Sequence, residues 1–153
     1  MVNLKKLLFS VFLCLSAGFV GSFFTTPAIP AWYASLNKPF FNPPNWIFAP
    51  VWTTLFLLMG VSLYLVWIKN GINSKPMIIF FIQLAFNLSW SILFFALKSP
   101  ISALIDIVIL WGLILSTILE FLKISKPAGY LLFPYLAWVS FASVLNFSIV
   151  ILN

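Results

Sequence analysis

Residues 101–122 read ISALIDIVILWGLILSTILEFL, and this run decides what kind of protein the chain forms. It is almost wholly apolar, although it contains both acidic residues of the chain. As an α-helix rising about 1.5 Å per residue, it would extend roughly 33 Å. The hydrocarbon core of a bilayer is about 30 Å thick. The run therefore predicts a transmembrane helix.

Four similar runs accompany it, and the five predicted spans cover about residues 7–24, 47–68, 77–97, 101–122 and 130–152. None of them alternates apolar and polar residues as the strands of a membrane barrel do. Short polar breaks ending in Pro76, Pro100 and Pro127 come before the last three spans, and proline suits the first turn of a helix. The predicted fold is an all-α integral membrane protein, a single five-helix bundle over residues 1–153 in contact with the lipid bilayer.

The composition agrees with this prediction. The chain of 153 residues is 63% hydrophobic and only 7% charged, whereas soluble domains are about 25% charged. A soluble enzyme, a nucleic-acid-binding module and a disordered chain are excluded on this ground. The formal net charge of +6 comes from scattered lysines rather than from a basic patch, so nucleic acid is not an expected partner.

The lysines predict the orientation of the bundle. One side carries Lys5, Lys6, Lys69, Lys75, Lys123 and Lys126, and the other carries Lys38 and Lys98. Because cytoplasmic loops are enriched in lysine, we expect a cytoplasmic N-terminus. The C-terminus and the first loop would then lie on the outer side.

The first predicted span has two interpretations. Two lysines followed by an apolar stretch resemble a signal peptide that would be removed. However, Ser10, Cys14, Gly18 and Ser22 recur at a spacing of four residues. Such a face of small residues allows close helix packing in lipid, which favours a retained helix. This face and the third span are both candidates for a dimer surface.

The long connection at residues 25–46 is rich in proline and aromatic residues. It is either an interfacial aromatic belt or a structured lid over a cavity between the helices. In the third span Gln83, Asn87 and Ser91 form a polar stripe on one helix face. The stripe either bonds helices to one another or lines a ligand cavity.

Aromatic side chains are predicted to meet beneath this connection. In the last span Trp138, Ala142 and Asn146 lie four residues apart, and the small Ala142 leaves room for a ligand. If the helices bundle, the rings that converge are Tyr33, Trp46, Trp52, Trp90 and Trp138. Flat apolar rings with a few N–H or O–H donors suit a large planar hydrophobic ligand.

Conventional catalytic groups are missing from the sequence. With no histidine, two acidic residues and one cysteine, no ordinary nucleophile pair or metal site is predicted. Asp106 lies within a span, where it serves either a proton or ion pathway or a hydrogen bond to the first loop, Lys38 or Lys98. Glu120 is expected to reach Lys123 or water.

The motifs resemble the translocator protein family, also called the TspO/MBR, tryptophan-rich sensory protein or peripheral-type benzodiazepine receptor family. The matching residues include Trp32-Tyr33, Lys38-Pro39, Pro43-Pro44, Pro50-Val51-Trp52-Thr53, Gln83-Leu84, Asn87, Trp90-Ser91, Pro134-Tyr135, Trp138, Phe141-Ala142 and Leu145-Asn146. The resemblance covers nearly the whole chain. It implies a homodimer of five-helix bundles that binds porphyrins such as protoporphyrin IX, and benzodiazepine-receptor drugs, beneath the first loop.

Transferred by motif, the pocket would comprise Tyr33, Pro43, Trp52, Gln83, Asn87, Trp90, Trp138 and Ala142, to which the expected ring convergence adds Trp46. Porphyrin would be a ligand, with no cofactor required, and Lys38 would be the partner of a porphyrin carboxylate. The function implied is a membrane binding protein or sensor. One alternative is light-dependent porphyrin degradation, with Trp52 and Trp138 as its catalytic residues.

The second alternative is transport of porphyrin or sterol. Animal members bind cholesterol, but their sterol motif needs a basic residue after a tyrosine in the last span. No lysine or arginine follows Lys126. Sterol binding by that motif is therefore not expected.

Overall fold

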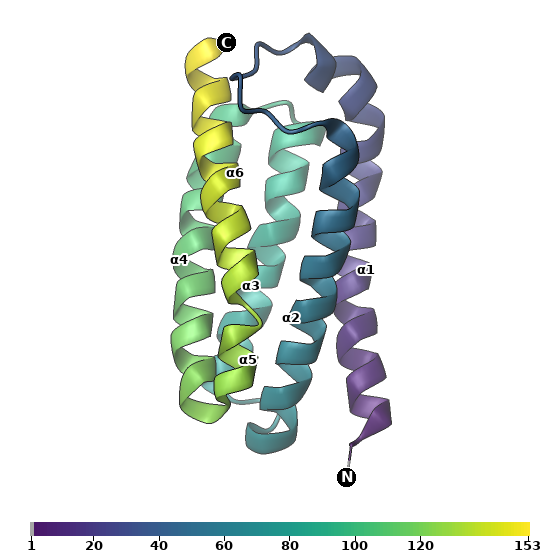
Figure 1. The fold of residues 1–153 in the computed structure, drawn as a ribbon, viewed down its shortest axis with the longest axis vertical. Helices are drawn as coiled ribbons and strands as arrows, with labels where there is room; N and C mark the ends of the chain where they lie inside the picture. The colour runs from purple at the N-terminus through teal and green to yellow at the C-terminus, as the bar shows by residue number, and fades with distance from the viewer. Residues whose placement is uncertain (1) are drawn as a thin grey trace.

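The computed structural model describes residues 2–153, and this part of the chain is helical without strands (Figure 1). The helices are α1 (Leu4–Ala28), α2 (Phe48–Asn70), α3 (Lys75–Ser91), α4 (Pro100–Ile124), α5 (Lys126–Tyr130) and α6 (Phe133–Leu152). Within this range, five helical spans are long and apolar enough to cross a bilayer. The predicted fold class is confirmed.

The first span is longer than predicted. Helix α1 passes through Pro27 to Ala28, and a π-helical segment, Ile29–Tyr33, continues it. The side chain of Tyr33 is only 3% exposed, because it packs against Phe94 and Phe95. This packing keeps the chain helical beyond the threonines and proline that favoured a helix end. The first loop therefore covers residues 34–44, rather than beginning at residue 25 as predicted.

The last span consists of two helices. Helix α5 ends at Tyr130, and α6 begins at Phe133 after a break of two residues. Pro134 lies in the first turn of α6, where its ring and missing N–H prevent a continuous helix with α5. Helix α5 is fixed from the side by α2, since Ser62 Oγ donates a 2.7 Å hydrogen bond to the carbonyl of Ala128.

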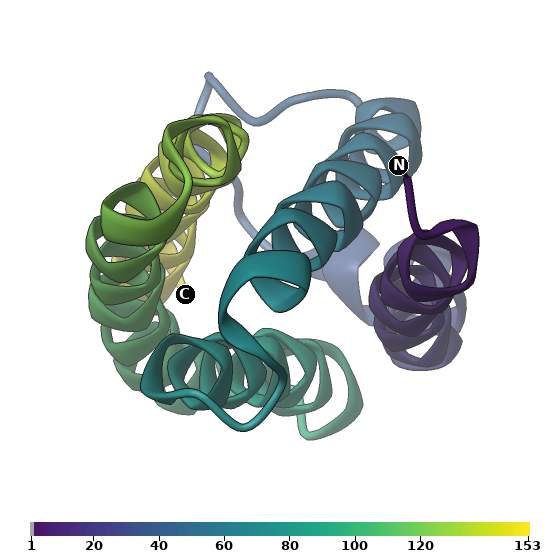
Figure 2. The ribbon, with the colours of Figure 1, turned by 90° about the horizontal axis from the view of Figure 1, so that it is seen from below.

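Seen from below, α4, α5 and α6 lie on one side of the bundle and α1 on the other, with α2 and α3 between them (Figure 2). Helix α1 packs against α2 and α3, and α4 packs against α3 and α6. Two residues of the predicted small-residue face of α1, Ser10 and Cys14, are fully inaccessible in these contacts, whereas Ser22 of the same face is exposed. A Cβ on Gly60 of α2 would lie 2.6 Å from the Cα of Val11. The half of the face nearer the N-terminus therefore packs within the bundle, and a role of α1 in a dimer stays a prediction.

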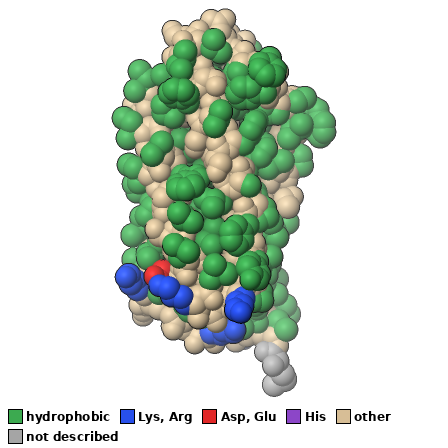
Figure 3. All heavy atoms as spheres, turned by 60° about the vertical axis from the view of Figure 1, so that its left-hand side comes forward, with side chains coloured by type: hydrophobic (Ala, Val, Ile, Leu, Met, Phe, Trp, Pro, Cys, Tyr) green, Lys and Arg blue, Asp and Glu red, His purple; other side chains and the backbone are tan. Residues whose placement is uncertain are grey.

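Charged side chains concentrate at one end of the bundle. The lysines visible in Figure 3 gather at the end where α1 begins, below a surface of hydrophobic side chains. This is the end reached by Lys69 of α2, Lys75 of α3 and Lys123 of α4. The first loop lies at the opposite end, which we call the loop end. Its assignment to the outer side of a membrane stays a prediction.

Candidate functional site

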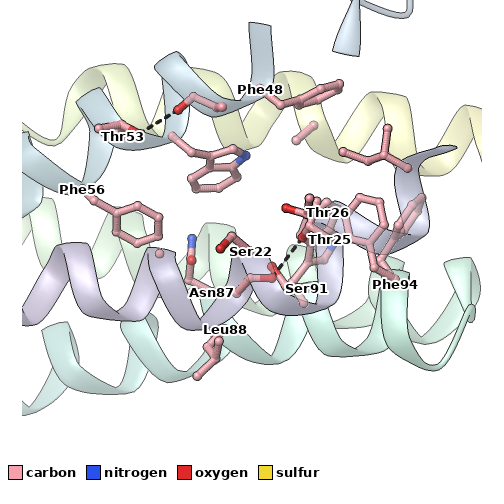
Figure 4. Close-up of a pocket in the computed structure, with 18 of the residues that line it drawn as sticks. Ser22, Thr25, Thr26, Phe48, Thr53, Phe56, Asn87, Leu88, Ser91 and Phe94 are labelled. Carbon is pink, nitrogen blue, oxygen red and sulfur yellow. Dashed lines mark hydrogen bonds between the residues drawn. The ribbon is translucent and has the colours of Figure 1, made fainter. Parts of the chain in front are cut away.

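A cavity of about 490 Å³ lies between α1, α2, α3 and α6 in the half of the bundle nearer the loop end (Figure 4). Six of the residues proposed from the sequence line it: Tyr33, Trp52, Asn87, Trp90, Trp138 and Ala142. They come from four helical segments that are far apart in the sequence. The structure thus brings together most of the predicted site.

Aromatic rings form the walls of the cavity. The Trp90 ring stacks on Phe94, with centroids 5.3 Å apart and planes 22° from parallel. On α2, the ring centroids of Trp52 and Phe56 are 5.7 Å apart. Phe48 meets Trp138 of α6 edge to face at 6.1 Å. Rings packed in this way present flat apolar faces to whatever occupies the space.

A chain of hydrogen bonds lies at the floor of the cavity. Asn87 Nδ2 donates to Tyr135 Oη, and Tyr135 Oη donates to Gln83 Oε1, each over 2.9 Å. Gln83 and Tyr135 are both only 1% exposed. Both interpretations of the polar stripe therefore apply, at different positions. Gln83 joins helices through Tyr135, whereas Asn87 both joins helices and lines the cavity.

The tryptophan N–H groups differ in their partners. Trp90 Nε1 donates to Asn146 Oδ1 over 3.1 Å, and Asn146 Nδ2 donates to the carbonyl of Pro100 over 2.9 Å. These two hydrogen bonds therefore hold the Trp90 ring in its orientation. In contrast, Trp138 Nε1 is buried and finds no hydrogen-bond partner among residues 2–153. An unpaired donor at a cavity wall is available to a ligand acceptor.

Four proposed residues do not line the cavity. Pro43 and Trp46 belong to the loop region, and the Trp46 side chain is 72% exposed, so the predicted convergence of five rings includes only the other four. Gln83 lies behind the wall. Lys38 is engaged elsewhere, because its Nζ donates to the carbonyls of Tyr33 at 2.8 Å and Leu36 at 3.0 Å.

The wall that α1 contributes was not predicted. Its hydroxyl side chains Ser22, Thr25 and Thr26 lie along the cavity, and Thr53 of α2 and Ser91 of α3 lie nearby (Figure 4). Most of these hydroxyls donate to a carbonyl of their own helix, as Thr53 Oγ1 does to Ala49 over 2.8 Å. The signal in the sequence was the cluster of three hydroxyl residues within an otherwise apolar span.

The acidic residues lie away from the cavity. Asp106 Oδ1 accepts a 2.5 Å hydrogen bond from Ser89 Oγ of α3, so the predicted partners in the first loop, Lys38 and Lys98 were wrong. The bond joins α3 to α4. This contact favours a structural role for Asp106. Glu120 pairs with Lys123 at 2.7 Å, as predicted.

The fold and the cavity define a class of protein: a helical membrane protein of five spans with an aromatic-lined internal cavity. Within the described residues, no three His, Cys, Asp or Glu side chains gather as they would around a metal ion. A family model described as the TspO/MBR family matches residues 10–152. The chain belongs to this family.

Relatives from bacteria and from an animal are similar to this chain over most of its length. The chain is 52% identical to "Tryptophan-rich protein TspO" of Chlorobaculum tepidum over 145 residues, which cover 92% of this chain and 91% of that one. It is 41% identical to "Translocator protein" of Bos taurus, over 85% of this chain and 79% of the other. It is also 37% identical to "Tryptophan-rich sensory protein" of Cereibacter sphaeroides, over 80% and 77% of the two chains.

Proposed function

We propose that the cavity binds a flat hydrophobic ligand of the tetrapyrrole type, such as protoporphyrin IX, and that the protein acts as a membrane receptor or sensor for it. The observation that carries the proposal is the cavity itself. Its volume of about 490 Å³ lies within the range of roughly 300–1,000 Å³ typical of small-molecule sites. Small-molecule sites are typically lined, as this cavity is, by aromatic and apolar side chains with a few polar atoms.

The distribution of charge supports a defined pose. None of the described residues that line the cavity is charged. A macrocycle would therefore lie among the rings, while its carboxylates would stay at the rim. There the hydroxyl of Thr26 and the carboxamide of Asn45 offer neutral donors, because the hydroxyls of Ser22 and Thr53 already donate to carbonyls of their own helices. Uncharged drug-like ligands of the benzodiazepine-receptor type would fit wholly inside.

Tryptophan fluorescence tests the proposal. Protoporphyrin added to the protein in lipid nanodiscs should quench the fluorescence saturably. Replacing Trp52 or Asn87 by alanine should weaken binding about tenfold, since each change costs roughly 1–2 kcal/mol of contact. The control is Trp111→Ala, because this indole donates to Ser140 Oγ outside the cavity. Unchanged affinity in both cavity variants would count against the site.

Light-dependent degradation of the porphyrin is a second candidate function. It is favoured by the position of Trp52 and Trp138, two oxidisable indoles that line the same cavity. Illumination of the complex in air should then produce a bilin-like absorption band. The double variant Trp52→Phe/Trp138→Phe should lose this band. Equal rates of porphyrin loss with and without the indoles would remove this candidate.

Transport, sterol binding and a homodimer stay predictions from the family resemblance. Proteoliposome flux of porphyrin no faster than that of empty vesicles would argue against transport. A monomer in native mass spectrometry of nanodiscs would argue against the homodimer.

A further inference from the structure

The cavity has a mouth on the side of the bundle. Its lining includes two rows of exposed residues that face each other across the seam between α1 and the start of α2. One row is Phe19, Ser22 and Thr26, and the other is Asn45, Ala49 and Thr53. Each row has the spacing of a single helix face. We call the opening between these rows the side slot.

The seam is closed on the other side of this slot. At Gly60, α2 approaches the backbone of α1 so closely that a Cβ would be 3.1 Å from the carbonyl oxygen of Ser10. One step nearer the slot, Phe56 fills the space over Gly18, where a Cβ would lie 2.5 Å from its ring. The two helices therefore touch towards the lysine-rich end and separate towards the loop end.

The first loop closes the end of the cavity above the slot. Tyr33 Oη donates to Asn42 Oδ1 over 2.7 Å, which holds the loop over the end of the first span. Asn37 N donates to Asn153 Oδ1, and Asn153 Nδ2 donates to the Asn37 carbonyl, both over 2.9 Å. None of the described residues 34–44 lines the cavity. A direct route to water through the loop would require these bonds to break.

The side slot lies within the apolar belt of the bundle. Thr53 is eight residues beyond Asn45, which places it about 12 Å along the helix. Large exposed apolar side chains flank the slot on both helices, including Phe23 and Leu57. A bilayer covers such a surface with acyl chains. The hydroxyls on the rim could meanwhile hold the polar edge of an amphiphilic molecule.

We propose that the ligand enters and leaves the cavity sideways, through the slot between α1 and α2, from the bilayer leaflet at the loop end. This inference rests on the proposed function and narrows it: the ligand must first dissolve in the membrane. The cavity then samples the lipid phase, and the first loop acts as a fixed cover.

Two adjacent threonines provide a matched test. Thr53 and Thr54 are both exposed, and each donates to the carbonyl four residues earlier over 2.8 Å. Thr53 lies on the slot, whereas Thr54 lies on an open groove between α2 and α6. Thr53→Phe would fill the slot, and Thr54→Phe would place the same bulk about 100° further around the helix, in the groove.

Stopped-flow quenching by protoporphyrin in nanodiscs should show slower association and slower dissociation for Thr53→Phe, each by roughly tenfold. A merely damaged cavity would instead release the ligand faster. Thr54→Phe should match the wild type. Equal rates in the two variants would overturn the proposal, as would slowing in Thr54→Phe alone, which would assign the route to the groove between α2 and α6.

A second measurement does not depend on tetrapyrrole binding. Phospholipids brominated in the acyl chain should quench the fluorescence of Trp52. The contribution of Trp52 is obtained by subtracting the fluorescence of Trp52→Phe from that of the wild type. Thr53→Phe should reduce this quenching severalfold, and Thr54→Phe should not. If protoporphyrin fails to bind the wild type, the proposed function fails, and this measurement alone decides the slot. Undiminished quenching in Thr53→Phe would overturn the proposal.

Discussion

Replacing Tyr135 by phenylalanine removes a single oxygen atom, yet it should disconnect α3 from α6 at the floor of the cavity. Both 2.9 Å hydrogen bonds of the Tyr135 hydroxyl, one from Asn87 and one to Gln83, would be lost. Hydrogen bonds between membrane helices average roughly 0.6 kcal/mol and reach about 1.7 kcal/mol. Because both partners would stay buried and unpaired, we expect the free energy of unfolding to fall by about 2 kcal/mol.

The assay is reversible unfolding in mixed micelles titrated with a denaturing detergent. Tyr130→Phe is the control, since it removes the same atom from a side chain that is 59% exposed. It should change the unfolding free energy by less than about 0.5 kcal/mol. The Tyr135→Phe variant should also bind protoporphyrin more weakly, because Asn87 loses the bond that orients its amide.

A double-mutant cycle with Gln83→Leu isolates the interaction. We expect a coupling energy of about 0.6–1.7 kcal/mol between Gln83 and Tyr135. A coupling near zero, together with a Tyr135→Phe variant as stable as Tyr130→Phe, would refute the reasoning. The hydroxyl would then contribute nothing to holding α3 and α6 together.

Three further substitutions test other contacts. Gly60→Leu should destabilise the bundle by about 2 kcal/mol or more, because the new side chain would meet the backbone of α1. The control is Gly112→Leu, which has open space around it and should not destabilise the bundle. The same unfolding assay compares the two variants. Ser89→Ala should cost about 1–3 kcal/mol, since it leaves Asp106 without its donor, and adding Asp106→Leu should recover much of the loss. Lys38→Met should speed amide hydrogen exchange in the first loop severalfold without altering exchange in the helices, because three loop-end carbonyls lose their donor.

The spans were predictable because length and hydropathy alone decide whether a helix can cross a bilayer. The ends of the three middle spans were also predicted to within about two residues, but the C-terminal end of the first span was not. At residues 25–33 the local signals favoured a loop, but the burial of Tyr33 against the third span maintains the helix. The packing of Tyr33 depends on residues some sixty positions away, which no local pattern includes.

The candidate site was likewise predictable in part. The four-residue spacing of Gln83 and Asn87 correctly predicted an inward face, since polar groups in lipid must turn inward. It could not show that Tyr135 would separate Gln83 from the cavity. The sequence likewise gives no reason to separate Trp46 from Trp52. The turn that leads into α2 leaves the Trp46 ring exposed and places the Trp52 ring against the cavity.

Helix α2 has a hollow on each side: the slot towards α1 and the open groove towards α6. It is held against α1 at Gly60, near the middle of the helix, just beyond the inner ends of both openings. If the half of α2 that precedes Gly60 tilts about this contact, any movement that widens one opening must narrow the other. Lipid that wedges into the groove would thus press α2 towards α1 and narrow the slot, so the packing of the surrounding membrane would control how readily a ligand is admitted.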